Sequence, residues 1–480
     1  MPRSSAFVAV ALALALLPAP AGSQQAPGPQ AFKGVWTGVL DAGAVKLRLV
    51  FHIDVTEGGA LSGTLDSPDQ GAAGIPASSV TADGATLRFA IAPMGATFEA
   101  TLSEDGTKLG GTFIQGPARL PLTASKGEAP PPPERPQHPK PPFPYRVEEV
   151  RVVNAGAGVT LAGTLTLPPG PGPFPAAVLV SGSGPQDRDE SLMGHKPFLV
   201  LADHLTRSGI AVLRYDDRGM GGSTGTFGTA TSEDFTSDAL AAVAFLGARP
   251  DVGAVGIVGH SEGGLVGPMA AARSQDVGFV VMLAGPGLTG EEIIQLQGEL
   301  ISRADGTPEE LIRLNLETQR RLFAAVRAEA DPATAAPKLL AILEESVAAL
   351  PAATREQMGE AARTQALAAQ VAQVNSPWFR FFLTHDPRLT LERVRVPVLA
   401  LNGELDLQVP AEANLREVRA ALERAGNRDA TTLLLPKLNH LFQTAETGSP
   451  KEYATITETM SPVALEAVSS WIRERFAGRD

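Results

Sequence analysis

The sequence contains no cysteine among its 480 residues. This absence excludes disulfide-stapled scaffolds, zinc fingers, thiolate metal sites and cysteine nucleophiles. Basic residues are also in the minority: 40 Lys and Arg stand against 52 Asp and Glu, so the net charge is −12 with histidine neutral. A nucleic-acid-binding protein needs a basic surface, and the composition therefore argues against this class. The length suggests roughly two to four domains, with ample chain for a buried core.

Long hydrophobic runs are scarce, and the one at the N-terminus is short. Arg3 precedes 12 consecutive apolar residues at 6–17, and small residues and prolines follow at 18–23. This arrangement is typical of a secretory signal peptide, whereas a transmembrane helix needs roughly 20 apolar residues. We therefore predict a signal peptide over residues 1–23, export to the periplasm or the extracellular space, and no membrane span. The alternative for this run is a buried N-terminal helix.

A proline-rich segment divides the rest of the chain. Nine of the 15 residues from 130 to 144 are proline, which is typical of an extended spacer and not of a packed element. We predict a linker over residues 130–145. It separates an N-terminal domain at 24–129 from a larger domain at 146–480.

The N-terminal domain has the pattern of antiparallel β structure. Glycine-containing turns recur at 42–43, 58–59, 83–84 and 105–106, and alternating apolar residues fill the segments between them. About eight short strands are expected, enough for a small antiparallel β-barrel-like domain or a sandwich. No residue cluster here suggests chemistry, so an accessory role is favoured over a ligand-binding barrel.

The larger domain alternates strands and helices. An antiparallel pair is expected at 147–153 and 160–167. Apolar strands then follow at 176–180, 210–215, 255–258 and 278–283, with helices at 198–208, 232–248 and 263–273. This alternation predicts an α/β fold with a parallel sheet covered on both faces. Between residues 288 and 385 the strand pattern gives way to helical spacing, which predicts a helical cap before strands resume at 396–401 and 430–435. A last helix is expected at 462–476.

The strongest chemical signal is the segment 259–264, which reads GHSEGG. It has the form G-x-S-x-G and stands between a predicted strand and a predicted helix, as a nucleophile turn requires. Gly259 and Gly263 leave room for the sharp bend that lifts out Ser261. The N–H of Glu262 would be one oxyanion donor at the start of the helix. The alternative is a strand–helix turn with an incidental serine.

A serine nucleophile needs a base and an orienting acid. The chain has seven histidines, at positions 52, 138, 195, 204, 260, 385 and 440. His440 follows a late strand and obeys the chain order serine, acid, histidine, so we favour it. The loop at 402–410 offers Glu404 and Asp406 as the acid, and spacing alone does not separate them. We expect His195 to lie within reach of the mouth of the site.

Further candidates have weaker signals. The small-residue loop at 181–187 follows a strand, and the N–H of Ser183 is the best candidate for a second oxyanion donor. Asp216, Asp217 and Arg218 are expected to form a structural ion-pair network. The aromatic residues at 378–382 either line an acyl pocket or anchor the cap, and the sequence does not decide between these roles.

The segment from about residue 147 onward resembles exported bacterial α/β-hydrolases of the carboxylesterase type. The resemblance rests on the motifs SGSGPQDRD at 181–189, RYDDRGMGGS at 214–223 and GHSEGG at 259–264. It rests also on PWFRFF at 377–382, PVLALNGELDLQVP at 397–410 and NHLFQ at 439–443. It implies Ser261, Asp406 and His440 as the triad, and Ser183 and Glu262 as backbone oxyanion donors. One departure is position 181, a serine where these hydrolases usually have histidine.

These observations predict a serine hydrolase that cleaves carboxylic esters through an acyl-enzyme. The alternatives are a serine peptidase or aminopeptidase with the same triad, and a non-catalytic binding protein of the same fold. The motifs of nucleotide and metal sites are missing from the sequence, so neither a cofactor nor a metal is expected. The expected partner is a small-molecule ester; nothing in the sequence indicates the oligomeric state.

Overall fold

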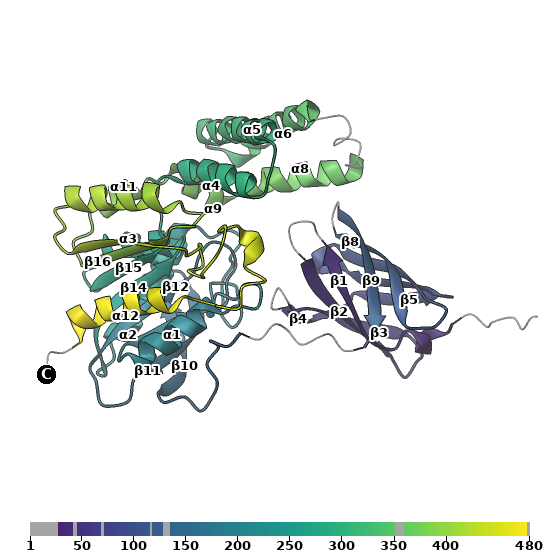
Figure 1. Ribbon diagram of the computed structural model, residues 1–480, viewed down its shortest axis with the longest axis horizontal. Helices are drawn as coiled ribbons and strands as arrows, with labels where there is room; N and C mark the ends of the chain where they lie inside the picture. Colours follow the sequence, from purple (N-terminus) through teal and green to yellow (C-terminus); the bar gives the residue numbers. More distant parts are fainter. Residues whose placement is uncertain are drawn as a thin grey trace, which may run out of the picture.

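The computed structural model describes residues 27–41, 46–68, 72–115, 118–127, 135–350 and 360–477. These residues form two separate β-sheets and a group of helices above the second sheet (Figure 1). The predicted signal peptide at 1–23 lies outside the described residues. Within them, no helix is both long enough and apolar enough to cross a membrane.

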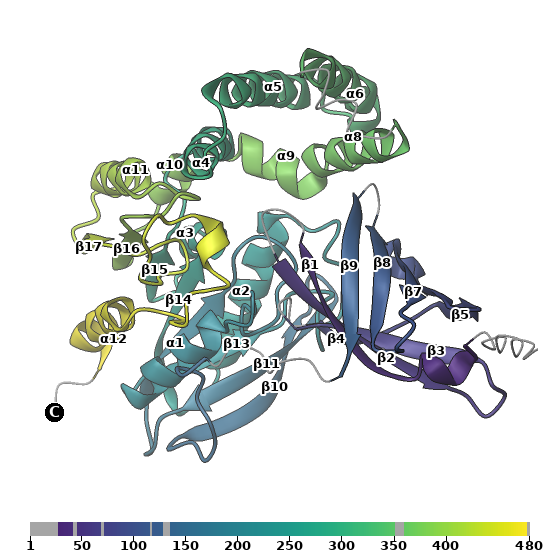
Figure 2. The same cartoon turned by 45° about the vertical axis from the view of Figure 1, so that its right-hand side comes forward.

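The N-terminal sheet is antiparallel and has nine strands, one more than expected, in the order β4-β3-β2-β1-β9-β8-β7-β6-β5. It curves around its own core in the manner of a half-barrel (Figures 1 and 2). Alternate side chains point into this core, where Trp36, Phe51, Phe89 and Phe98 are fully buried. The strands are β1 Gly34–Asp41, β2 Lys46–Val55, β3 Leu61–Ser67, β4 Ala72–Pro76, β5 Ser79–Asp83, β6 Thr86–Ile91, β7 Ala96–Leu102, β8 Lys108–Gln115 and β9 Ala118–Lys126.

The second sheet has eight strands in the order β10-β11-β13-β12-β14-β15-β16-β17. β10 and β11 pair antiparallel, as predicted. The remaining strands, β13, β12, β14, β15, β16 and β17 in sheet order, pair parallel with one another. The strands are β10 Arg146–Asn154, β11 Val159–Leu167, β12 Phe174–Val180, β13 Ala211–Tyr215, β14 Val252–His260, β15 Phe279–Leu283, β16 Val398–Gly403 and β17 Ala430–Leu435.

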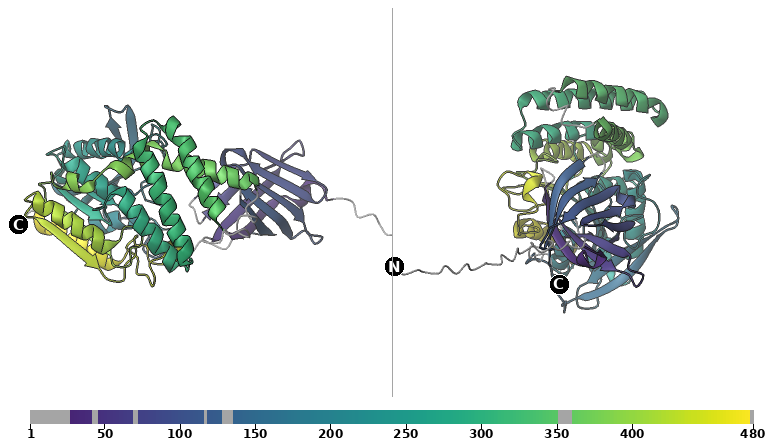
Figure 3. Two further views of the ribbon diagram at one scale, coloured as in Figure 1. Left: turned by 90° about the horizontal axis from the view of Figure 1, so that it is seen from above. Right: turned by 90° about the vertical axis from the view of Figure 1, so that its right-hand side faces the viewer.

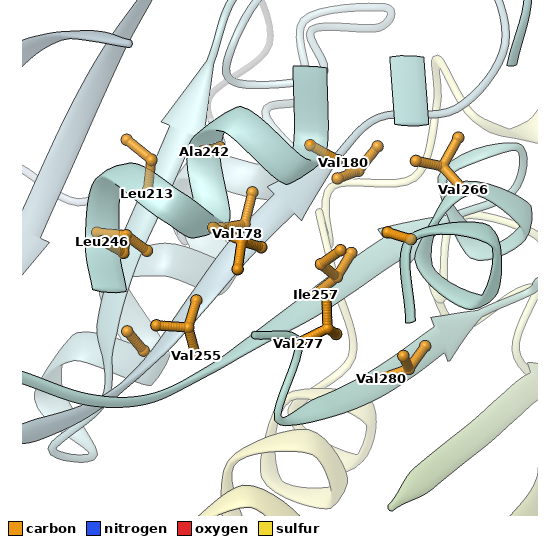
Figure 4. Packing of buried hydrophobic residues seen from close by; sticks show 14 of the residues in the cluster. Val178, Val180, Leu213, Ala242, Leu246, Val255, Ile257, Val266, Val277 and Val280 are labelled. Carbon is orange, nitrogen blue, oxygen red and sulfur yellow. The ribbon is translucent and has the colours of Figure 1, made fainter. Parts of the chain in front are cut away.

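Helices cover both faces of this sheet because neighbouring residues of a strand point to opposite sides. Val178 packs on the face covered by α2, α3 and α11, and Leu179 packs on the face covered by α1 and α12 (Figure 4 shows the first face). The helices are α1 Pro197–Arg207, α2 Ser232–Gly247, α3 Gly263–Ala271, α11 Ala411–Arg424 and α12 Pro462–Phe476. The predicted elements omit α11, although Pro410 and an apolar face mark it.

Of the described helices between β15 and β16, five form a group above the second sheet (Figures 2 and 3). Their own small core includes Leu322, Phe323, Leu339 and Phe379. We call this group the cap; it comprises α4 Gly290–Ala304, α5 Glu309–Ala328, α6 Pro332–Ala349, α8 Glu360–Val374 and α9 Pro377–Thr384. The short helix α10, Pro387–Leu391, leads back to the sheet and packs against α3 and α11.

The described part of the proline-rich segment is fastened to the larger domain. The Arg135 guanidinium donates to the backbone carbonyls of Met193, Ala454 and Ile456. The side-chain amide of Gln137 donates to the carbonyl of Met460, and its oxygen accepts from two backbone N–H groups of the same loop. This segment is therefore not a free spacer from residue 135 onward.

Candidate active site

The turn that carries Ser261 is as sharp as its glycines suggest. Ser261 has a backbone φ of +53°, a left-handed conformation that residues other than glycine rarely adopt. A methyl group at position 259 would lie 1.9 Å from the carbonyl oxygen of Gly263. One at position 263 would lie 2.0 Å from the carbonyl oxygen of Val180. The two glycines are therefore required for β14 to pass directly into α3 and to present the serine at the start of that helix.

His440 and Asp406 approach from two other loops at the same end of the sheet. Asp406 follows β16 and His440 follows β17, and their Oδ2 and Nδ1 atoms are 2.8 Å apart. The other carboxylate oxygen of Asp406 accepts hydrogen bonds from the backbone N–H groups of Gln408 and Val409. Glu404, the second candidate acid, instead accepts from the backbone N–H of Lys437. The geometry thus pairs the histidine with Asp406 and not with Glu404.

Ser261 and His440 open onto one cavity beneath the cap, with a volume of about 440 Å³. We call it the active-site cavity. Ser183 and Glu262, the two residues expected to supply oxyanion donors, also line it. In the part of the chain that the structure describes, the Ser261 hydroxyl has no hydrogen-bond partner. In free enzymes the hydrogen bond from a serine to its neighbouring base often forms only when substrate binds.

We call the loop at 181–187, which carries the candidate donor Ser183, the oxyanion loop. Two buried carboxyl groups hold it in place. Asp217 accepts hydrogen bonds from the Ser181 hydroxyl and from the backbone N–H of Gln186, both at 3.0 Å. Glu190 accepts from the backbone N–H of Gly182 at 2.7 Å. The Ser181 hydroxyl thus anchors the loop at 181–187.

His260 is a supporting residue that sequence reasoning missed. Its Nδ1 lies 2.9 Å from a carboxylate oxygen of Glu190, and its Nε2 lies 3.0 Å from the backbone carbonyl of His440. Burial disfavours the charged imidazole, but the Glu190 carboxylate outweighs it and raises the pKa of His260. The pair Glu190 and His260 therefore connects the oxyanion loop to the backbone of His440. Adjacency to Ser261 was the one signal in the sequence that pointed to this histidine.

The expectation for His195 is wrong. Its side chain is fully buried, with Nε2 2.9 Å from the Tyr453 carbonyl and Nδ1 3.0 Å from the Thr459 hydroxyl, and it does not line the active-site cavity. Burial lowers its pKa to about 4. His195 therefore holds the loop that follows His440 and does not meet substrate.

The aromatic residues of α9 divide between the two roles considered. Trp378, Phe379 and Phe382 line the active-site cavity, whereas Phe381 stacks on His385. Trp378 also donates its indole N–H to Glu262, at 2.7 Å, and stacks on Phe382. Glu262, the residue next to Ser261, is thus tied directly to the cap.

Two of the three charged residues at 216–218 form the expected ion pairs. Arg218 pairs with Asp234 and Asp238 of α2, and Asp216 pairs with Arg188. Asp217 does not belong to this network, because both of its carboxylate oxygens hold the oxyanion loop. Burial, together with the nearby carboxylates of Glu262 and Glu190, raises the pKa of Asp217 to about 8, although its two hydrogen bonds oppose the shift.

This raised pKa predicts a stability that falls as the pH rises. Below about pH 4 the Asp217 carboxyl is protonated in both the folded and the unfolded chain; between about pH 4 and about pH 8 only the unfolded chain releases the proton. The free energy of unfolding should fall there by up to about 1.4 kcal/mol per pH unit. Asp217→Asn has no titrating group at this position, so its free energy of unfolding should not show this fall. The stability of the variant relative to the wild type should therefore increase from pH 5 to pH 7.

Urea unfolding at several pH values measures this difference. The exposed carboxylate of Asp276 supplies a matched control, and Asp276→Asn is expected to keep the wild-type pH dependence. Parallel stability curves for Asp217→Asn and the wild type would contradict the prediction.

The eight-stranded sheet, the glycine-flanked serine turn and the helical insertion before β16 define an α/β-hydrolase. The family model described as serine aminopeptidase, S33, matches residues 196–446, which is more than half of the chain. The chain belongs to this family of hydrolases.

A curated relative is esterase EstD of Thermotoga maritima, 30% identical over 294 residues. The match covers 61% of this chain, and the chain spans only 61% of the length of that relative. Among solved structures, the Pyrococcus furiosus esterase Pf2001 matches 70% of this chain and 92% of its own, at 14% identity and a TM-score of 0.42. Est1E of Butyrivibrio proteoclasticus, solved with ferulic acid, matches 68% and 98% at 16% identity and a TM-score of 0.39.

Proposed function

We propose that this protein hydrolyses carboxylic esters through an acyl-enzyme on Ser261. The observation that carries the proposal is that Ser261 and His440 line one cavity while Asp406 lies 2.8 Å from His440, in the chain order serine, acid, histidine. The likeness to esterase EstD supports an ester as the substrate.

In the proposed reaction His440 takes the proton of the Ser261 hydroxyl while the oxygen attacks the ester carbonyl. Asp406 holds the imidazole and stabilises its positive charge. The backbone N–H groups of Ser183 and Glu262 bind the oxyanion of the tetrahedral intermediate. His440 then gives the proton to the leaving alcohol. Water repeats the sequence on the acyl-enzyme, releasing the acid and restoring the serine.

The lining of the active-site cavity favours an ester over a peptide with a free amino terminus. An aminopeptidase would need a carboxylate there to bind the substrate ammonium. Among the described residues that line the cavity, Glu262 is the only acid. Its carboxylate already accepts hydrogen bonds from Ser232 and Trp378, and burial raises its pKa, which disfavours the charged form.

A comparison of p-nitrophenyl acyl esters with aminoacyl p-nitroanilides at equal concentration tests the choice. We expect turnover of the esters and none of the anilides. Turnover of the anilides alone would replace the proposal with a peptidase. A fluorophosphonate probe tests the remaining alternative: a non-catalytic protein would leave Ser261 unlabelled.

The proposal includes a small-molecule ester as partner, with neither nucleic acid nor a membrane span involved. It also includes export to the periplasm or beyond, on the strength of the signal-peptide pattern at residues 1–23.

A further inference from the structure

The ring of His260 contacts two parts of the site that come from different segments of the chain. Its Nδ1 lies 2.9 Å from Oε1 of Glu190, and the same oxygen accepts the backbone N–H of Gly182 at 2.7 Å. Its Nε2 lies 3.0 Å from the backbone carbonyl oxygen of His440. Gly182 belongs to the oxyanion loop and directly precedes Ser183, the proposed donor. One imidazole ring therefore connects the oxyanion loop to the loop that carries the base.

The packing around this ring is tight. The side chains of His260 and Glu190 are only 7% and 6% exposed. A methyl group at position 182 would lie 3.2 Å from Cβ of Ser261 and 3.6 Å from Nδ1 of His260, so the oxyanion loop packs against both residues. The ring centroids of His260 and His440 are 4.8 Å apart. A displaced His260 ring would therefore disturb the oxyanion loop and the base together.

The two hydrogen bonds of His260 define the protonation of its ring. A carbonyl oxygen can only accept, so Nε2 donates a proton to the carbonyl of His440. Oε1 of Glu190 already accepts the N–H of Gly182, so it accepts from Nδ1 as well. An imidazole with a proton on each nitrogen is positively charged, and the carboxylate of Glu190 balances this charge. Burial opposes the charge, but Glu190 outweighs burial and raises the pKa of His260, in agreement with a charged ring.

Titratable groups face this pair from three further loops. Asp406, after β16, favours the charged ring of His260. His440, after β17, opposes the charge of that ring when it is itself protonated. Asp217, after β13, lies near Glu190, and its pKa of about 8 leaves it largely protonated at neutral pH. The carboxylate of Glu190 is therefore the main support of the charge on His260.

We propose that Glu190 and His260 are positioning residues, which hold the oxyanion loop and His440 in register through a His260 ring that is protonated on both nitrogens. The inference rests on the proposed ester hydrolysis and adds two residues to its machinery. Neither side chain lines the active-site cavity, so both act through other residues. A misplacement of a catalytic group by about 1 Å costs roughly 100-fold in rate, so loss of either hydrogen bond should lower kcat and leave KM nearly unchanged.

Glu190→Gln tests the role of the charge through the pH dependence of kcat for p-nitrophenyl esters. The amide oxygen can still accept from Gly182 and His260, but it carries no charge. Burial then lowers the pKa of His260 with less opposition, and a neutral ring can donate only one of its two hydrogen bonds. We expect the ratio of kcat in the variant to kcat in the wild type to fall about tenfold as the pH rises from 4.5 to 7.5. The titration of His440 is common to both proteins and cancels in this ratio.

The double variant Glu190→Gln, His260→Gln assigns the titration. Its residue 260 has no titrating group, so the ratio of its kcat to that of the wild type should be low and independent of pH. A fall that persists in the double variant would come from another group, such as Asp217, and would overturn the inference.

Asp66→Asn is the matched control. In the N-terminal sheet Asp66 also contacts a histidine, His52, at 2.7 Å, and its other carboxylate oxygen accepts the backbone N–H of Gly74. This variant should keep the wild-type kcat at every pH. In Glu190→Gln, a ratio near one throughout the pH range, or a loss confined to KM, would overturn the inference. If thermal unfolding shows that Glu190→Gln does not fold, His260→Gln alone must lower kcat about tenfold at an unchanged KM.

The rate of labelling of Ser261 by a fluorophosphonate separates this inference from the proposed function. Labelling needs the base and the oxyanion donors but no ester. Labelling rates that show the predicted pH pattern without any turnover of esters would support the positioning role and reject ester hydrolysis. A wild-type protein that neither labels nor turns over esters would reject both.

Discussion

Ser261→Ala should lower ester turnover by about 10⁴- to 10⁶-fold, because no other group replaces the attacking oxygen. The variant should remain folded. Its backbone at position 261 keeps the hydrogen bond from its N–H to the Leu283 carbonyl, and alanine adopts φ of +53° no less readily than serine. Steady-state hydrolysis of p-nitrophenyl esters, with thermal unfolding as the folding check, measures both effects.

Ser274→Ala provides the matched control, since among the described residues its hydroxyl bonds to Asp276 alone and lies outside the active-site cavity. We expect it to retain wild-type turnover and labelling by a fluorophosphonate. Persistent labelling or turnover in the Ser261→Ala protein would place the nucleophile elsewhere.

Asp406→Asn should lower kcat/KM by about 10⁴-fold while leaving the fold intact. The reason lies in the hydrogen bonds around this residue. The N–H groups of Gln408 and Val409 both donate to one carboxylate oxygen, so the amide oxygen of the variant must stay there. The new NH₂ group then faces Nδ1 of His440, which must accept, and the ring proton moves to Nε2. In that tautomer the imidazole cannot take the proton of Ser261.

The control for this variant is Glu404→Gln, which also replaces a carboxylate by an amide. Glu404 lies in the same loop, and sequence spacing could not distinguish it from Asp406. It should turn over esters at close to the wild-type rate. Ser261 labelling separates a chemical role from a structural one: Asp406→Asn should label far more slowly at an unchanged melting temperature. If Glu404→Gln proves the more damaging change, the pairing of His440 with Asp406 is not the functional one.

The nucleophile turn and the chain order of the acid and the base are visible in the sequence because each follows from local rules. The glycines at 259 and 263 are needed by any chain that bends this sharply around Ser261. Parallel strands end at one edge of a sheet, so residues after β14, β16 and β17 meet there. The choice between Glu404 and Asp406 depended on the resemblance alone, since two residues of separation in a loop have no fixed direction.

The rest of the site depends on packing that no local pattern encodes. His260 and Glu190 are 70 residues apart and meet only when the oxyanion loop folds against β14. His195 sits in a loop like many active-site histidines, but the loop at 453–459 covers it. The glutamines of the cap are ordinary helix residues in the sequence. Gln297 of α4, Gln319 of α5 and Gln373 of α8 line one cavity because the cap brings their helices together.

The fastening of Arg135 and Gln137 also fixes where an independent catalytic fragment has to begin. A fragment cut at residue 146, where the first strand of the second sheet starts, would lack both side chains and expose the carbonyls of Ile456 and Met460 that they satisfy. Ile456 belongs to the loop at 453–459 that covers His195, and Met460 directly follows that loop. His195 in turn contacts Gln443, which lies three residues beyond His440. A fragment for expression should therefore begin at or before Arg135, although the proline content of this segment is typical of a linker.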